Sequence, residues 1–117
     1  MTGEQAPTLS VNLVRLSGQL IERKALRYTP AGVPVSEFRI GHQSEQIEAG
    51  LLRRVECELA VIALGVPARL VQELPLGAGV RIEGFLAARS RNSRQPTLHV
   101  NTIEFVEGNE NAETLQA

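Results

Sequence analysis

The chain has 117 residues, a formal net charge of −1, 43% apolar residues and 21% charged residues. This balance is typical of a globular protein and excludes a disordered or fibrous chain, and the length suits one hydrophobic core but not two. The sequence has no run of about 18 apolar residues, and residues 1–10 lack the basic start and apolar run of a signal peptide. We therefore expect a cytoplasmic protein.

Disulfide, metal and catalytic chemistry are not expected. Cys57 has no partner cysteine, and at a strand position we interpret it as a small buried apolar group. His42 and His99 are far apart and in no ligand spacing, so we predict no metal site. The chain has no Asp and no Trp, no serine stands in a nucleophile motif, and the glycines form no phosphate loop. We predict neither a cofactor nor an enzyme.

The charge is unevenly distributed along the chain. Four of the thirteen acidic residues fall in the first ten and the last eleven residues. Twelve basic residues therefore face nine acidic ones between Val11 and Val106, which makes this part of the chain about +3. A mildly basic body is compatible with a polyanionic partner, but it is also common on surfaces that are merely soluble. Eleven of the twelve cations are Arg, which grips phosphate bidentately, although high genomic GC content also enriches Arg.

The first half of the chain predicts an arm and two strands. Residues 1–10 are polar and without period, so we expect an arm without fixed structure. Val11 to Ile21 alternates with period two, and Gly18 suits a strongly bent barrel strand. Thr29 to Gly32 has the pattern of a type I turn that closes a hairpin. Val33 to Gln43 predicts the second strand, with a parity slip that indicates a bulge near Ser36 and Glu37.

The second half predicts one short helix and three more strands. Ser44 to Leu52 is polar and contains Gly, so we expect a loop. Arg53 to Leu64 alternates as a third strand, and Val66 to Leu74 has the apolar spacing of a helix with Pro67 in its first turn. The later segments are a fourth strand over Val80 to Leu86, a loop over Arg89 to Pro96, a fifth strand over Thr97 to Val106 and an acidic tail over residues 108–117.

Three strands, a short helix and two strands predict an all-β, five-stranded Greek-key barrel of the OB type, with the helix between strands 3 and 4. A small open sandwich is the structural alternative. We expect one domain over residues 11–107, flanked by a disordered arm over residues 1–10 and a disordered tail over residues 108–117.

Arginines mark a candidate nucleic-acid site on this barrel. Arg89, Arg91 and Arg94 lie in the predicted loop between strands four and five, which flanks the oligonucleotide-binding face of an OB barrel. The other interpretation is a soluble hairpin tip that avoids aggregation. Arg27 and Tyr28 are predicted to border the same face. Arg39 and Arg54 are predicted to point out of the core, and Arg53 is predicted to lie at a loop edge.

Glu56 and Glu58 share a strand face at period two and could form a carboxylate pair. We interpret them as solvated residues on an outer strand face, because the sequence supplies no other part of a catalytic site.

Two segments carry a resemblance to a known family. The stretch Leu26 to Val35, followed by Phe38 and Ile40, resembles the strand-turn-strand signature of bacterial single-stranded-DNA-binding proteins, and Val80 to Leu86 resembles their fourth strand. Together with His42, Ser44, Glu48-Ala49-Gly50 and Cys57, the chain is most similar to the primosomal replication protein N (PriB) family, over roughly Asn12 to Glu107.

The resemblance implies a homodimer of OB folds that binds single-stranded DNA and works with the PriA helicase and a primosomal loader protein at stalled replication forks. It also implies that Arg27 corresponds to a basic contact beside the first turn, and that Arg89, Arg91 and Arg94 correspond to the basic DNA-binding loop.

The chain departs from the family pattern at three positions. Better-known members carry a Trp where this chain has Glu56, an aromatic residue where it has Leu51 and a basic residue where it has Gln43, although Arg39 lies near enough to compensate. Because two stacking platforms are missing, we expect weaker binding that depends mainly on charge.

Two rivals to the primosomal interpretation remain. A general single-strand-binding protein would carry an acidic C-terminal tip ending in an apolar dipeptide, and Glu113 to Ala117 does not have that pattern. A protein-protein adaptor with weak DNA binding is favoured by Glu56 and by the scarcity of aromatic residues, which make up 3% of the chain.

Overall fold

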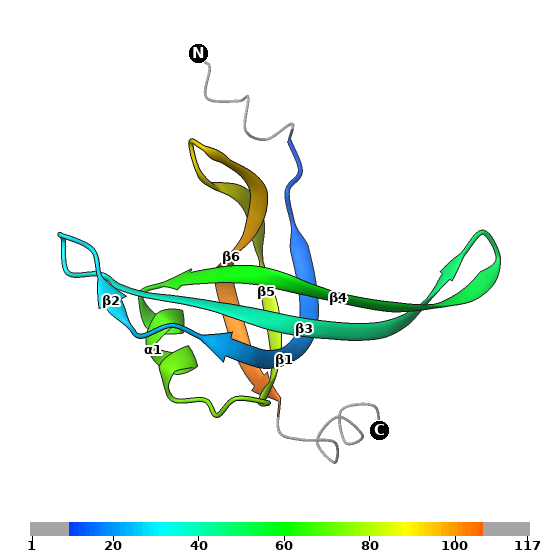
Figure 1. Ribbon diagram of the computed structural model, residues 1–117, viewed down its shortest axis with the longest axis horizontal. Helices are drawn as coiled ribbons and strands as arrows, with labels where there is room; N and C mark the ends of the chain where they lie inside the picture. Colours follow the sequence, from blue (N-terminus) through cyan, green and yellow to red (C-terminus); the bar gives the residue numbers. More distant parts are fainter. Residues whose placement is uncertain (1–9, 107–117) are drawn as a thin grey trace.

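The computed structural model describes residues 10–106 (Figure 1). Five long strands, one two-residue strand and one short helix make up this part of the chain. In chain order they are β1 (Val14–Arg23), β2 (Arg27–Tyr28), β3 (Pro34–Glu48), β4 (Leu51–Leu64), α1 (Val66–Gln72), β5 (Gly79–Ser90) and β6 (Ser93–Val106). The predicted strands and the predicted helix are therefore confirmed in number and order.

The strands form a closed Greek-key barrel. Their order in the sheet is β1-β5-β6-β4-β3-β2, and β1 also pairs with β3, which closes the barrel. β4 and β6 pair in parallel over a short stretch, in which Val61 is opposite Leu98 and Ile62 is opposite His99. This is the arrangement of an OB fold, so the predicted fold class is confirmed.

β1 closes the barrel because it bends at Gly18. Its first half pairs with β5 up to Gln19, and its second half pairs with β3 from Gln19 onward. A Cβ atom at Gly18 would lie 2.5 Å from the backbone oxygen of Gly41, so only glycine allows the two strands to approach so closely.

The core fills the barrel and the space beneath α1. Its largest fully buried apolar side chains come from five strands and the helix: Leu20, Ile40, Ile82, Leu98, Val61, Val71 and Val80. α1 buries Ala68 and Val71 against this cluster and begins with proline in its first turn, as predicted. It ends at Gln72, two residues before the predicted end.

The turn before β3 also matches its prediction. The backbone N–H of Gly32 donates to the carbonyl of Thr29 at 2.8 Å, and Gly32 has a φ of 88°. This left-handed conformation at the fourth position closes the hairpin that joins β2 to β3.

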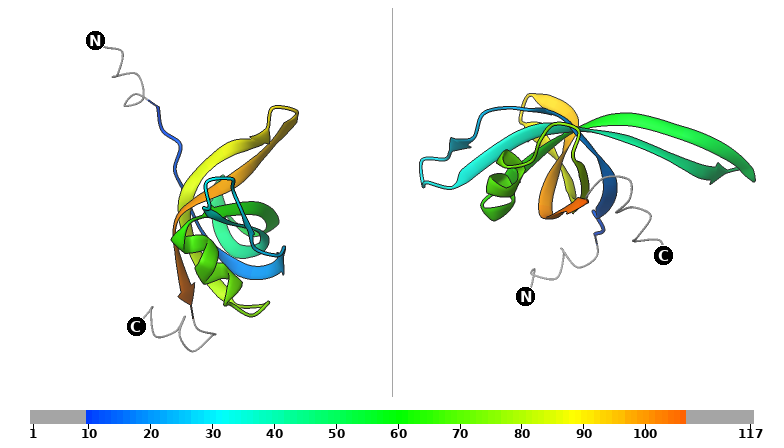
Figure 2. Two further views of the ribbon diagram at one scale, coloured as in Figure 1. Left: turned by 90° about the vertical axis from the view of Figure 1, so that its left-hand side faces the viewer. Right: turned by 90° about the horizontal axis from the view of Figure 1, so that it is seen from below.

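The predicted loop over Ser44 to Leu52 is wrong. β3 and β4 continue through it as a regular hairpin whose turn is Ala49 and Gly50, both with positive φ, and this hairpin projects beyond the barrel (Figures 1 and 2). We call the projecting part, residues 42–57, the arm. Both faces of the arm lie outside the core, and its polar residues, not an irregular backbone, produced the loop-like pattern. Three large apolar side chains of the arm, Ile47, Leu51 and Leu52, are exposed.

The predicted loop over Arg89 to Pro96 is also mostly strand. β5 runs to Ser90 and β6 starts at Ser93, so only Arg91 and Asn92 form the turn of the β5–β6 hairpin.

The predicted bulge near Ser36 and Glu37 is wrong as well. The pairing of β3 with β4 is unbroken from Val35–Leu64 to Glu48–Leu51. The parity slip arises because Ser36, a polar residue, takes the core-facing position, where Gln72 donates a hydrogen bond to its hydroxyl at 3.1 Å. The irregularities lie in β1, between Leu20 and Glu22, and in the β5–β6 pair.

The predicted terminal segments, residues 1–10 and 108–117, lie outside the described residues, apart from Ser10. Their disorder therefore stays a prediction. Within residues 10–106, no helix is long and apolar enough to cross a membrane. The same part of the chain contains no group of three His, Cys, Asp or Glu side chains that could hold a metal ion.

Candidate nucleic-acid interface

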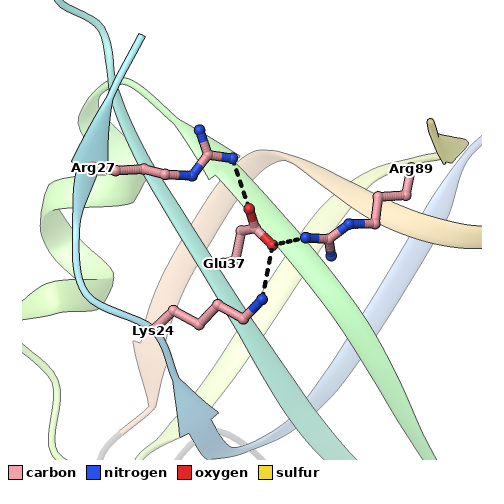
Figure 3. Close-up of polar contacts among 4 residues, drawn as sticks. All are labelled: Lys24, Arg27, Glu37 and Arg89. Atoms are coloured by element: carbon pink, nitrogen blue, oxygen red, sulfur yellow. Dashed lines mark hydrogen bonds and ion pairs between the residues drawn. The ribbon is translucent and has the colours of Figure 1, made fainter.

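Three cations converge on one carboxylate on the outer face of β3 (Figure 3). Arg27 Nη2 donates a hydrogen bond to Glu37 Oε2 at 2.6 Å. Arg89 Nη2 lies 2.6 Å from Oε1 and Lys24 Nζ lies 3.6 Å from the same oxygen. The side chain of Glu37 is only 12% exposed, whereas those of its three partners are 51% to 65% exposed. We call these four residues the Glu37 cluster.

The Glu37 cluster is assembled from four separate segments. Glu37 is on β3, Arg27 is on β2, Lys24 follows β1 and Arg89 lies near the end of β5. Arg27 pairs directly with Val35, so its side chain lies on the same face as Glu37, two residues along β3. The cluster therefore joins the β1–β3 connection to the β5–β6 hairpin across the outer face of β3.

The cations hold Glu37 in its charged form. The hydrogen bond from Arg27 is the largest influence and lowers the pKa of the Glu37 carboxyl below its ordinary value of 4.5. Burial opposes this effect, and the charges of Arg89 and Lys24 add to the lowering of the pKa. Three cations against one carboxylate leave the cluster with a net charge of +2 at neutral pH.

Arg39 extends this basic region along β3. It lies two residues from Glu37 on the same face, and its Nη2 is 3.6 Å from Glu58 Oε1 on β4. A small cleft of about 230 Å³ lies between these groups, lined among others by Lys24, Glu37, Arg39 and Arg89. The outer face of β3 therefore presents Lys24, Arg27, Arg39 and Arg89, and three of these cations, Lys24, Arg39 and Arg89, line one recess.

The other two cations of the β5–β6 hairpin lie at its end. Arg91 is in the turn and Arg94 is the second residue of β6, and both are exposed. Neither makes an ion pair with any residue of the described range 10–106. The hairpin thus brings together Arg89, Arg91 and Arg94, as the sequence predicted, although their contact with nucleic acid stays a prediction.

The predicted candidates on the arm do not join this cluster. Arg53 and Arg54 are both on β4, not at a loop edge, and as neighbours on a strand they point to opposite faces. Arg53 forms an ion pair with Glu48, whereas Arg54 is paired in register with Glu45 on the outer face.

Tyr28 also lies apart from the predicted face. It follows Arg27 on β2 and so alternates to the other side of the strand, where the guanidinium of Arg69 on α1 lies 5.9 Å from the centre of its ring. The expectation that Arg27 and Tyr28 border the same face is therefore not met.

The outer face of β4 is acidic around Glu56, the position where the sequence resemblance implies an aromatic residue. Glu56 and Glu58 both lie there, exposed, and Glu58 contacts Arg39. They are side chains on a solvent-facing strand, as we interpreted them. Cys57, between them, is exposed, which makes its interpretation as a buried group wrong, because this part of β4 lies beyond the core.

Sequence reasoning missed Lys24 and Glu37 as members of the site. One signal could have indicated Glu37: it has the same parity as Arg39, so both residues point out of the core from one strand. No signal in the sequence pairs Glu37 with Arg89, because that contact depends on how the β5–β6 hairpin approaches β3.

Comparisons with known proteins show to which family this chain belongs. Residues 12–102 match the model of a family whose description is "Another single-strand binding protein family". Replication restart protein PriB of Bordetella pertussis is 39% identical over 98 residues, which cover 84% of this chain and 92% of that protein. PriB of Nitrosomonas europaea is 37% identical over 99 residues, covering 85% and 92%. The chain belongs to the PriB family.

Solved structures agree with the PriB assignment. The structure of PriB from Ralstonia solanacearum has a TM-score of 0.74 at 29% identity and covers 82% of this chain and 98% of that one. The single-stranded DNA binding protein of Thermus aquaticus has a TM-score of 0.69 at 27% identity, with 86% of this chain and 52% of that chain covered. The predicted resemblance to PriB and to the wider OB-fold family of single-strand-binding proteins is therefore confirmed.

Proposed function

We propose that this member of the PriB family binds single-stranded DNA as an accessory protein of replication restart and catalyses no reaction. In this role it stabilises the PriA helicase on DNA and assists a primosomal loader protein, as a homodimer in the cytoplasm. The relatives named above support the replication-restart role, since they are replication restart proteins.

The observation that supports DNA binding best is the convergence of Lys24, Arg27, Arg39 and Arg89 on the outer face of β3. A strand of unpaired DNA carries one phosphate per nucleotide, and cations along one face can contact successive phosphates. The β1–β3 connection and the β5–β6 hairpin flank this face, which is where OB folds bind oligonucleotides.

The experiment replaces the hairpin cations. The triple variant Arg89→Ala, Arg91→Ala, Arg94→Ala should lose most of its affinity for a fluorescent oligo-dT measured by anisotropy, because phosphate contacts are removed. Arg15→Ala, Arg81→Ala is the control, since both arginines lie on other surfaces, where they pair with Glu83 and Glu104. Equal affinity of the two variants would contradict the proposed site, and a wild-type protein that binds no single strand would contradict the function.

A protein-protein adaptor is the second candidate, because the exposed Glu56 and Glu58 place negative charge on the outer face of β4. The triple variant separates the two roles, because it lacks the proposed phosphate contacts of the β5–β6 hairpin. The measurement is how strongly this variant stimulates the helicase activity of PriA. Under the adaptor hypothesis, the triple variant would stimulate PriA as well as the wild type does.

The homodimer is tested by sedimentation. Phe85 on β5 is 37% exposed and stacks on His99 of β6, with ring centres 5.2 Å apart. An exposed aromatic residue such as Phe85 on a sheet face is compatible with burial against a second subunit. Sedimentation equilibrium should give twice the mass of one chain, and a monomeric mass at micromolar concentration would contradict the dimer.

A further inference from the structure

Glu37 differs from the other carboxylates of the outer face in how deeply it lies. Its side chain is 12% exposed, whereas that of Glu58, its neighbour on the same face, is 61% exposed. A carboxylate at this depth is stable only while its cations stay in place, since a buried charge without partners is costly. A phosphate from solvent therefore does not readily displace the Glu37 carboxylate from its position beneath the three cations.

The cations keep donors for a ligand while they hold Glu37. Each guanidinium carries five N–H groups, and Arg27 and Arg89 each direct one terminal nitrogen at the carboxylate. Both side chains remain more than half exposed, so a ligand can approach them from solvent. With Lys24, the cluster presents a net charge of +2 above a carboxylate floor.

Glu37 is also the link between two flanking segments. Within the described part of the chain, no other hydrogen bond or ion pair joins the β1–β3 connection to the β5–β6 hairpin. Without the negative charge of Glu37, Arg27 and Arg89 would repel each other, and their long side chains would regain rotamer freedom.

We propose that Glu37 is a positioning residue that holds Arg27, Lys24 and Arg89 as one phosphate-binding cluster and thereby links the β1–β3 connection to the β5–β6 hairpin. This inference rests on the proposed binding of single-stranded DNA. It assigns a favourable role in DNA affinity to an acidic residue, which is the reverse of what simple charge repulsion predicts.

Glu37→Gln tests the sign of the effect. This variant keeps the shape of the side chain and makes the protein more positive by one charge, yet oligo-dT binding should weaken about fivefold, because Arg27 and Arg89 no longer engage phosphate together. The dependence of log K on log salt should also become shallower by about 0.7, the equivalent of one phosphate.

Glu83→Gln is the matched control. It removes the same charge from a surface Arg–Glu pair of similar length, the contact of Arg15 with Glu83 at 2.7 Å, on another part of the barrel. Its affinity should rise by less than about twofold, as expected for a screened surface charge. Binding of Glu37→Gln that equals or exceeds binding of Glu83→Gln would overturn the proposal, because Glu37 would then act as a competitor of DNA or as a bystander.

A double-mutant cycle tests the linkage in proteins that keep Glu37. Arg27→Ala and Arg89→Ala should each weaken binding, and the double variant should weaken it by clearly less than the product of the two factors, because the residues act as a unit. In the Glu37→Gln background the two factors should multiply. Multiplication of the two factors in proteins that keep Glu37 would by itself overturn the proposal, and that measurement does not require Glu37→Gln to fold. If wild-type protein binds no oligo-dT at low salt, the proposed function fails first, whereas intact wild-type binding with either negative result rejects only the role of Glu37.

Discussion

At the scale of single residues, two glycines determine how closely the barrel strands approach. Gly18 allows β1 to pass Gly41, and Gly84 lies where a Cβ atom would be 1.8 Å from the backbone oxygen of His99. Both contacts are with backbone, which cannot move aside as a flexible side chain would. Gly84 is at the irregularity between β5 and β6, so the local twist of the barrel depends on it.

Gly84→Ala should therefore destabilise the protein severely. Because β5 and β6 would have to separate, we expect a loss of about 3 kcal/mol in the free energy of unfolding, measured by urea denaturation. Gly41→Ala is the control, since its Cβ atom would meet Ile21 Cγ2 at an ordinary 3.5 Å. It should change stability by less than about 1 kcal/mol. Similar unfolding midpoints for the two variants would contradict this account.

The Glu37 cluster should make stability depend on pH in the acid range. The pKa of Glu37 is lower in the folded protein than its ordinary value of 4.5, so the ionised carboxylate favours folding. Its contribution is complete above that value and is lost as the pH falls through the lowered pKa of the folded state. Glu37→Gln should be less stable than wild type at pH 7, and the difference between them should shrink below pH 4.5 in thermal melts. A difference that stays constant down to pH 3 would contradict the cluster.

At the scale of elements, the arm shows where sequence patterns mislead. A strand with one buried face alternates apolar and polar residues, but residues 42–57 extend past the core and expose both faces. The polar residues of this segment give it the composition of a loop, and only the turn at Ala49 and Gly50 carries a local signal of the hairpin. Cys57 was misplaced for the same reason, because its strand is regular but the core does not reach it.

The arm also offers a gain-of-function test. Glu56→Trp places an aromatic residue where the sequence resemblance implies one, on the same face as Arg39. An added stacking platform contributes roughly 1 to 3 kcal/mol per base, so oligo-dT affinity should rise about fivefold or more. The chain has no other Trp, so quenching of its fluorescence reports stacking directly. Glu56→Gln separates the loss of charge, and equal affinities of Trp and Gln variants would show that no base stacks there.

At the scale of the whole molecule, the sequence predicted the barrel better than it predicted the site. Period-two alternation and the turn at Thr29 to Gly32 report local geometry, and the resulting succession of three strands, a helix and two strands favours a small Greek-key barrel. The Glu37 cluster depends instead on contacts between residues 10 to 52 positions apart in the chain, from Arg27 with Glu37 to Glu37 with Arg89. Strand register and hairpin curvature determine such contacts, and neither is written in a local pattern.

The charge of the whole surface should control how binding responds to salt. The described part of the chain carries a surplus of basic residues, with Lys24, Arg27, Arg39 and Arg89 on one face and Arg91 and Arg94 at the adjacent hairpin tip. Few aromatic residues are present to stack bases, so electrostatics should dominate. If a single strand engages about four of these cations, log K should fall by roughly 2.8 per tenfold rise in salt. Anisotropy titrations with oligo-dT at several salt concentrations give this slope. A slope near zero would mean that binding depends on contacts other than these cations, because counterion release accompanies every phosphate that a cation neutralises.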